Sequence, residues 1–223
     1  MHKRPIKRNA RPSGAPSIFV IAGTNGAGKS SVAGEMFLEH GVESFNPDEA
    51  AKRLRSVNLS LSIEASSAAA WQTGVRLLRR AIDQRLRFAF ETTLGGHTIT
   101  ALLESAALSG VRIRIWYVGL LSPELHIQRV RARVARGGHD IPEEKIRERY
   151  DQSRSNLLRL LPLLSELRLY DNSDEGARTI PDPKLILHLA DGKLVRRINL
   201  DKAPGWTKPI FMEALRLDRA NRA

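Results

Sequence analysis

The chain has 223 residues, a length that suits one globular domain with a sizeable core. It contains no cysteine, which excludes a disulfide framework and a thiolate metal site and is typical of a reducing cytoplasm. Hydrophobic residues make up 42%, but no apolar run is long enough for a transmembrane helix, and the N-terminus lacks the apolar segment of a signal peptide. We therefore expect a cytoplasmic protein without a membrane partner.

The formal net charge is +12, and part of it is concentrated in residues 1–16, which have basic side chains and no acidic ones. Such a segment is either a disordered, solvated tail or an arm that binds nucleic acid. We favour the tail, because the segment has no aromatic residue on which a base could stack. No repeat or linker divides residues 17–223, so we expect them to form one domain.

A phosphate-binding loop is predicted near the start of this domain. Residues 23–30 read GTNGAGKS, which fits the spacing G-x-x-x-x-G-K-[ST], between an apolar strand over 18–22 and a helix over 31–38. In this context the backbone N–H groups and the helix N-terminus converge on one polyphosphate. Lys29 is then expected at the β- and γ-phosphates and Ser30 at Mg²⁺. The residues expected to bind the nucleotide are Gly23, Thr24, Asn25, Gly26, Ala27, Gly28, Lys29, Ser30 and Ser31.

The first candidate catalytic acid follows a short strand expected over 42–45. Asn46 suits a helix N-cap and Pro47 the first helical position, so Asp48 falls in the first turn. This turn lies at the carboxyl end of a strand, where open α/β sheets carry their chemistry. Two interpretations stay open: Asp48 is a general base that takes the proton of a substrate hydroxyl, or it is a plain helix-capping acid.

A second candidate acid follows the next strand. Apolar residues at helical spacing predict a helix over 62–86, and residues 87–91 read as a strand that ends in Glu91. Glu91 is a candidate for catalysis or for Mg²⁺, and Thr92 and Thr93 are candidates for hydrogen bonds to substrate. The competing interpretation is a strand that simply runs into a polar turn.

Strands and helices continue to alternate in the rest of the chain. A helix over 98–108 and a strand over 111–118 are followed by helices and a last core strand over 167–170. This order predicts an α/β fold of the P-loop, nucleotide-kinase type, with a mostly parallel sheet flanked by helices. Residues 184–198 predict a β-hairpin about an Asp-Gly turn, and 206–217 a closing helix, so we expect a C-terminal hairpin and helix within 180–220.

A helix that begins near residue 122 places its arginines away from its apolar side. These residues are Arg129, Arg133 and Arg136. The helix runs into a hinge-like segment over 137–142 and then into a second basic helix from Glu143. A mobile hairpin that carries arginines suits phosphoryl transfer, because the charge on the transferring group must be neutralised and water excluded. We favour this lid over the alternative, a solvated arginine face.

Several classes of P-loop protein have characteristic sequence motifs that this chain lacks. It has no four-residue apolar run ending in Asp as in AAA and ABC ATPases, no N-K-x-D as in GTPases, and no L-S-G-G-Q. A motor or a switch is therefore disfavoured, and a small kinase is favoured.

Taken together, these motifs resemble the zeta toxin family of P-loop kinases. The resemblance implies ATP and Mg²⁺ as cofactors, phosphorylation of a sugar hydroxyl of a nucleotide sugar such as UDP-N-acetylglucosamine, and a small antitoxin protein as partner. It spans about residues 17–172 and rests on GTNGAGKS at 23–30, NPD at 46–48, ETTLGG at 91–96, and the run from Arg129 through GGHDIPEEKIRERY to Leu157.

The resemblance also implies roles for individual residues. Lys29 and Ser30 look like the groups that hold ATP and Mg²⁺, and Asp48 looks like the base. Arg133 and Arg136 look like the lid arginines that clamp the triphosphate. The residues expected at the substrate are Asn46, Asp48, Glu91, Thr92 and Thr93.

Other functions remain as alternatives. A kinase of this type could act on nucleic-acid ends or antibiotics. From a different class, the chain could be a nucleotide-regulated protein that binds nucleic acid through residues 1–16, or an inactive binding partner that retained the P-loop.

Overall fold

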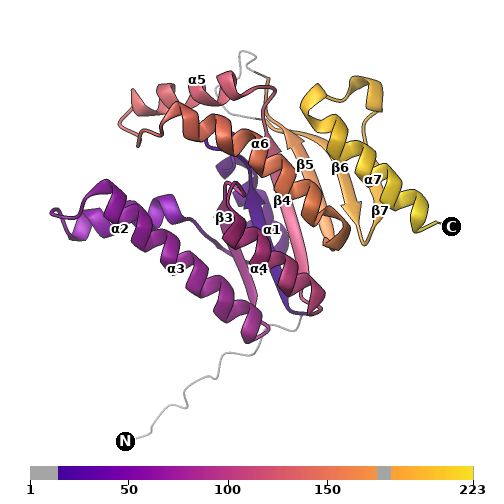
Figure 1. Ribbon diagram of the computed structural model, residues 1–223, viewed down its shortest axis with the longest axis horizontal. Helices are drawn as coiled ribbons and strands as arrows, with labels where there is room; N and C mark the ends of the chain where they lie inside the picture. Colours follow the sequence, from indigo (N-terminus) through magenta and orange to yellow (C-terminus); the bar gives the residue numbers. More distant parts are fainter. Residues whose placement is uncertain (1–14, 175–181, 223) are drawn as a thin grey trace, which may run out of the picture.

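The structure, a computed structural model, describes residues 15–174 and 182–222. Within this part of the chain, helices flank one mostly parallel sheet (Figure 1). The predicted tail over 1–16 lies outside the described residues as far as Gly14.

The strands of the sheet lie in the order β2-β3-β1-β4-β5-β6-β7. Neighbouring strands from β2 to β5 pair in parallel, and β6 and β7 add to the edge in antiparallel pairing. The strands are β1 (Ser17–Ala22), β2 (Ser44–Phe45), β3 (Arg87–Thr92), β4 (Arg112–Gly119), β5 (Glu166–Asp171), β6 (Lys184–Ala190) and β7 (Lys193–Arg197).

The helices occur where the sequence predicts them, with small shifts at their ends. Asn46 caps α2 and Ser122 caps α5, each followed by a proline at the start of the helix, as expected. The helices are α1 (Ser30–His40), α2 (Pro47–Val57), α3 (Ile63–Asp83), α4 (His97–Leu108), α5 (Pro123–Val134), α6 (Glu143–Leu160) and α7 (Lys208–Ala220), with short 3-10 turns at Leu161–Leu163, Leu200–Lys202 and Gly205–Thr207.

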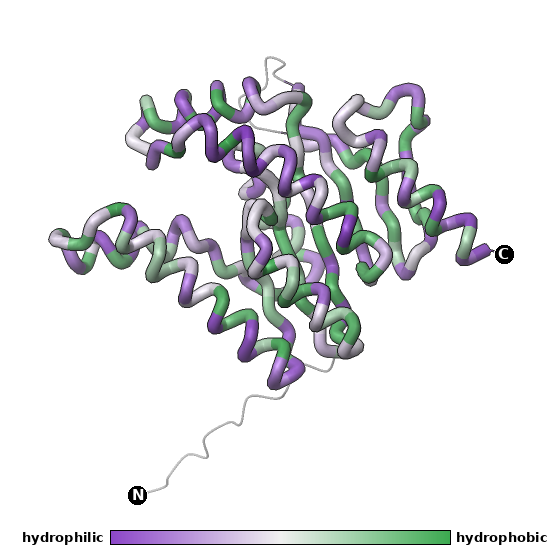
Figure 2. Tube along the Cα trace, viewed as in Figure 1, coloured by the Kyte–Doolittle hydropathy of each residue, from purple (hydrophilic) through white to green (hydrophobic). Residues whose placement is uncertain are grey.

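The core lies on both faces of the sheet. On one face, residues of α3, α4, α6 and α7 pack against alternate strand residues such as Val20 and Ile115. On the other face, α1 packs against the residues between them, such as Ile21 and Trp116. Burial on both faces explains why β1 reads as a continuous apolar run. In Figure 2 the hydrophobic residues concentrate on these central strands, and α6 is largely hydrophilic on its outer side.

Two predicted elements are longer than the observed ones. The helix expected over 62–86 ends at Asp83, because Arg85 takes a left-handed backbone conformation with φ of 51° and turns the chain toward β3. Leu86, predicted to lie on the apolar stripe of the helix, is instead 45% exposed. The strand expected over 42–45 is reduced to Ser44–Phe45, an edge strand that pairs with β3 alone.

The parallel pairing brings the carboxyl ends of the strands to one edge of the sheet. Asn46 follows β2, the P-loop follows β1, and Thr93 follows β3. In the part of the chain that the structure describes, no helix is both long enough and apolar enough to cross a membrane.

Candidate active site

The P-loop adopts a conformation that requires its glycines. Gly23 and Gly28 have φ values of 141° and 85°, in the region that favours glycine. A Cβ on Gly23 would lie 2.1 Å from the carbonyl oxygen of Val118, and one on Gly28 would lie 2.4 Å from Nδ2 of Asn172. The loop therefore packs tightly against the ends of β4 and β5. Its other side leads into the N-terminus of α1, which suits a polyphosphate.

Side chains from distant parts of the chain hold the P-loop in place. Asn172 donates from Nδ2 to the carbonyl oxygen of Ala27 over 2.8 Å. His126 Nδ1 lies 2.8 Å from the carbonyl oxygen of Asn25. Because a carbonyl oxygen only accepts hydrogen bonds, His126 carries its proton on Nδ1. Burial lowers the pKa of His126 to about 4, so its imidazole is neutral at pH 7.

Lys29 lies at the centre of the candidate site. Its Nζ donates to the carbonyl oxygen of Gly23 over 2.9 Å, which turns the side chain back over the loop. Burial lowers the pKa of Lys29, and the carboxylates of Glu91 and Asp48 oppose this shift. Ser30 is the first residue of α1 and is exposed, so its hydroxyl is accessible to a metal ion bound beside the phosphates.

The two candidate acids reach this centre from adjacent strands, and their surroundings differ. Asp48 is exposed in the first turn of α2. Glu91 is only 8% exposed, and burial raises its pKa, whereas Lys29 beside it favours the charged form. Asn46 connects the two acids. Its Oδ1 accepts from the Asp48 N–H over 2.9 Å, and its side chain is near enough to Glu91 to lower the pKa of that acid.

The threonine hydroxyls after Glu91 shape the loop that follows. Thr92 Oγ1 accepts from the N–H of Leu94 over 3.0 Å, and Thr93 Oγ1 accepts from the N–H of Gly95 over 3.4 Å. Each hydroxyl keeps its own proton for another acceptor. The expected substrate-binding groups therefore also fix the backbone at the end of β3.

The arginines of the predicted lid differ in where they point. Arg133 is close enough to Lys29 to lower its pKa, and it donates to the carbonyl oxygen of His139 over 2.9 Å. Arg136 is exposed and donates within α5 to the carbonyl oxygen of Ala132 over 3.2 Å. Arg133 thus binds the hinge and is near enough to Lys29 to affect its pKa, whereas Arg136 is exposed and bonds within α5.

A third arginine, Arg149 of α6, lies in the site without having been predicted there. It donates to Oδ1 of Asn25 in the P-loop over 2.8 Å and, like Arg133, lowers the pKa of Lys29. One signal in the sequence could have found it. Arg149, Ser153 and Asn156 follow at helical spacing, which makes a polar stripe beside the apolar stripe of the helix.

Among the described residues there is no cluster of acidic, histidine or cysteine side chains that could hold a metal ion by themselves. The residues present do fit a Mg²⁺ ion held together with a nucleotide. They provide the exposed hydroxyl of Ser30, a loop that only glycines allow, and carboxylates at the next strand ends.

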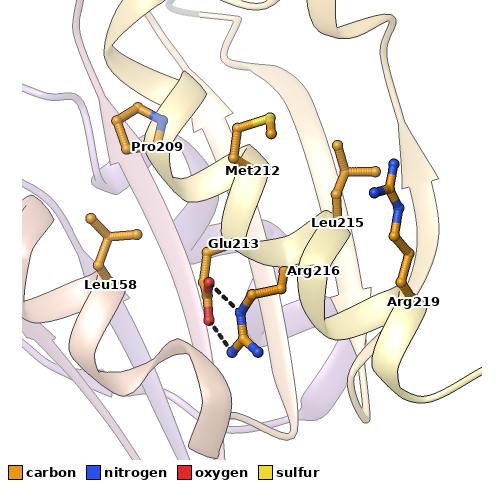
Figure 3. A pocket seen from close by; sticks show the side chains of 7 residues that line it. All are labelled: Leu158, Pro209, Met212, Glu213, Leu215, Arg216 and Arg219. Carbon is orange, nitrogen blue, oxygen red and sulfur yellow. Dashed lines mark hydrogen bonds and ion pairs between the residues drawn. The ribbon is translucent and has the colours of Figure 1, made fainter.

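A surface cavity of about 640 Å³ lies away from this site, between α6 and α7 (Figure 3). Leu158 and Met212 contribute apolar walls, and an ion pair between Arg216 and Glu213 lies at its margin. None of the predicted site residues lines this cavity. The candidate chemistry is therefore located at the P-loop.

Comparison with known proteins agrees with this geometry. The family model for zeta toxin matches residues 2–177. A protein of Haemophilus influenzae (strain ATCC 51907 / DSM 11121 / KW20 / Rd), itself uncharacterised, is 30% identical over 133 residues, which are 57% of this chain and 88% of that protein.

Solved structures share the fold at low sequence identity. A chain of the AvrRxo1-ORF1:-ORF2 complex with ATP aligns with a TM-score of 0.64 at 14% identity, and the match covers 91% of this chain and 64% of that one. A chain of the PezAT toxin–antitoxin system of Streptococcus pneumoniae aligns with a TM-score of 0.54 at 15% identity, over 74% of this chain and 72% of that one.

The family match, together with the P-loop, supports a nucleotide-binding, kinase-like function. On this evidence, the chain belongs to the zeta toxin family.

Proposed function

We propose that this protein is an ATP-dependent kinase that transfers the γ-phosphate to a hydroxyl group of a small molecule, with Mg²⁺ as the metal. The observation that carries the proposal is the set of charged groups around Lys29 in the P-loop. Arg149 donates to Asn25 of this loop over 2.8 Å, and Arg133 and Arg149 lower the pKa of Lys29, whereas Glu91 and Asp48 raise it. Cations neutralise the charge of a transferring phosphoryl group, and a carboxylate can take the proton of the attacking hydroxyl.

The phosphate-binding half consists of the P-loop and the cations around it. Backbone N–H groups of the P-loop and the Lys29 ammonium would hold the β- and γ-phosphates. Ser30 would bind Mg²⁺, which neutralises part of the phosphate charge when it is bound. Arg149 is already fixed on Asn25, so it stabilises the charge with little reorganisation.

The acceptor half contains the base. Asp48 removes the proton of the acceptor hydroxyl as its oxygen bonds to the γ-phosphorus, and the bond from that phosphorus to the bridging oxygen breaks to release ADP. Asp48 suits this role better than Glu91, because it is exposed to an incoming acceptor. Glu91 is buried, and the nearby side chains of Asn46 and Ser44 lower its pKa.

For the acceptor we propose a nucleotide sugar such as UDP-N-acetylglucosamine, on the strength of the family resemblance. Polar groups at the ends of β2 and β3 support a hydroxyl-rich acceptor. Asn46, Thr92 and Thr93 all lie at this edge of the sheet. We further propose a small antitoxin protein as partner, because structural neighbours of this chain occur in a toxin–antitoxin system.

The test uses purified protein, Mg²⁺, ATP and UDP-N-acetylglucosamine, with mass spectrometry to detect a phosphorylated sugar nucleotide. Asp48→Asn is expected to lower kcat by about 100-fold or more while ATP still binds. Glu49→Gln is the matched control, because Glu49 lies in the same helical turn but is ion-paired with Lys52. We expect it to leave kcat unchanged.

Two outcomes would overturn the proposal. One is that phosphate is transferred neither to UDP-N-acetylglucosamine nor to any of a panel of hydroxyl-bearing metabolites, nucleic-acid ends and antibiotics. The other is transfer that is as fast in Asp48→Asn as in Glu49→Gln, which would remove Asp48 as the base.

A further inference from the structure

The helix that carries Arg149 also contacts the loop after β3. Arg149, Ser153 and Asn156 are spaced i, i+4 and i+7 along α6 and so lie on one side of it. Ser153 and Asn156 are buried although they are polar, with exposures of 0% and 8%. Buried polar side chains are normally satisfied by specific partners. Here the partners lie in residues 93–96.

This loop contains a strained residue. Leu94 has φ of 55°, in the left-handed region that a branched side chain avoids, and its side chain is completely buried. Such a conformation persists only where surrounding contacts enforce it, and it is often found at functional sites. Leu94 is three residues beyond Glu91, so its backbone determines how the loop leaves the site.

Two side chains of α6 hold the backbone of this loop. Asn156 donates from Nδ2 to the carbonyl oxygen of Leu94 over 2.8 Å. Ser153 donates its single proton to the carbonyl oxygen of Thr93 over 2.6 Å. The hydroxyl of Tyr117, 2.9 Å from Ser153 Oγ, must therefore be the donor in that pair, which orients the serine.

Arg149 lies directly against the same loop. A Cβ on Gly95 would be 2.9 Å from Cγ of Arg149, so the loop passes under the arginine with no room for a side chain. From there Arg149 reaches Asn25 in the P-loop. One helix thus contacts both the phosphate-binding loop and the loop that follows the candidate acceptor residues.

We propose that Ser153 and Asn156 are positioning residues, which hold the strained loop over 93–96. By holding this loop they keep Glu91 and Thr93 in a fixed position relative to Arg149 and the P-loop. The proposal rests on the kinase function proposed above. It places the role of Ser153 and Asn156 on the acceptor side of the reaction. The residues do not touch ATP or acceptor; they act through the backbone of Thr93 and Leu94.

The test compares Ser153→Ala and Asn156→Ala with two controls on the same helix, Ser155→Ala and Gln152→Ala, whose side chains do not contact this loop. With UDP-N-acetylglucosamine as acceptor, each test variant is expected to lower kcat/KM for the acceptor about tenfold, which is the effect of losing one buried hydrogen bond. The Kd for ATP, measured by calorimetry, should stay within about twofold, because the P-loop contacts of Arg149 remain.

A second measurement needs no acceptor. Amide hydrogen exchange at Leu94 and Gly95 should accelerate in both test variants and not in the controls. Tyr117→Phe, which removes only the hydroxyl that orients Ser153, should show the same change in smaller degree. This variant keeps the test valid if Asn156→Ala does not fold.

The outcomes separate the two proposals. Unchanged exchange at Leu94 and Gly95 in the test variants would overturn the positioning role, whatever the acceptor. So would equal loss of acceptor turnover and ATP affinity, which indicates general damage. Failure of the wild-type protein to phosphorylate any acceptor would instead remove the kinase function, while faster exchange would still support the contact between α6 and this loop.

Discussion

At the scale of single residues, the site depends on side chains that are buried in a defined protonation state. His126 is 1% exposed, lies edge-on to Tyr150 and bonds the backbone of Asn25. A protonated imidazole at this place would be buried beside the cations Lys29, Arg129 and Arg154, which lower its pKa further. The His126 imidazole is therefore neutral in the folded protein, and its protonation destabilises the folded state.

This argument predicts how stability depends on pH. In the unfolded chain His126 binds a proton near pH 6.5, whereas in the folded protein its pKa is about 4, so the unfolded state binds more protons between these values. The neutral His126 therefore contributes stability that is fully present above pH 6.5 and is lost as the pH falls toward 4. At 1.36 kcal/mol per pKa unit, the loss in the free energy of unfolding amounts to about 3 kcal/mol.

The measurement is the free energy of unfolding by denaturant at several pH values, for the wild type and for His126→Asn. His126→Asn is expected to lack the pH dependence that comes from protonation of His126. The free energies of unfolding of the wild type and the variant should therefore converge as the pH falls from 6.5 to 4. Parallel curves over that interval would contradict the assignment of a neutral, buried His126.

At the scale of elements, α2 combines a structural and a chemical task at its first turn. Asn46 caps the helix by accepting from the N–H groups of Asp48 and Glu49, and its side chain also lowers the pKa of the nearby Glu91. The cap therefore fixes where Asp48 lies relative to the buried acid. Ser62 caps α3 in the same manner, by accepting from the N–H of Ala65, but has no contact with the site residues named above.

These two caps offer a matched pair of variants. Asn46→Ala and Ser62→Ala are each expected to lower the free energy of unfolding by about 1 kcal/mol, the usual cost of losing an N-cap. Only Asn46→Ala should also lower kcat, because Asn46 caps the turn that carries Asp48 and is near enough to Glu91 to lower its pKa. Denaturant unfolding and phosphoryl transfer to the acceptor measure the two effects. Equal activity of both variants would show that the Asn46–Glu91 contact has no catalytic consequence.

The beginning of α6 packs against α5 in a small apolar cluster, whereas the end of α6 belongs to the main core. Ile127, Val130 and Ile146 form a satellite cluster apart from the main core. Ion pairs of Arg147 with Glu124 and of Arg131 with Glu143 join the two helices on the outside. Arg133 of α5 donates to the carbonyl oxygen of His139 in the hinge and is near enough to Lys29 to lower its pKa.

At the scale of the whole molecule, the C-terminal part supports the nucleotide end of the sheet. β6 and β7 lengthen the sheet beyond β5, and Trp206 returns to the end of β4. The indole covers Gly119, where a Cβ would lie 2.3 Å from the ring, and its Nε1 donates to Oδ1 of Asp171 over 2.8 Å. Asp171 precedes Asn172, which holds the P-loop.

Loss of this contact should affect both stability and the site. Trp206→Phe leaves the 9% exposed carboxylate of Asp171 without its indole donor, which should cost about 2 kcal/mol of unfolding free energy. It should also weaken ATP binding through Asn172. Trp71→Phe is the control, because Trp71 is 47% exposed, and its effect should stay within about 0.5 kcal/mol. Equal stability of the two variants would contradict a supporting role for Trp206.

Local patterns in the sequence were sufficient for the P-loop, the parallel strands, the caps of α2 and α5 and the C-terminal hairpin. Each depends on spacing within a few residues, such as the glycines before Lys29 or the Asp-Gly turn, so neighbouring residues decide it. The end of α3 was not predictable in this way. Arg85 occupies the left-handed position of a helix C-cap that glycine usually takes, with the Leu86 N–H donating to the carbonyl oxygen of Ala81 over 2.8 Å, and no glycine or proline marks this point in the sequence.

By itself, the sequence predicted a phosphate-binding loop that contains Lys29 and placed acids after the neighbouring strands. Only the tertiary structure decided which side chains meet there. Arg149 and Arg136 are both arginines on the predicted lid, and the direction of α6 across the P-loop brings in the first and leaves the second exposed. The same holds for three other side chains that form hydrogen bonds to residues far away in the sequence, namely those of Ser153, Asn156 and Trp206. Periodicity identifies a face of a helix, but the packing angle between elements determines what that face touches.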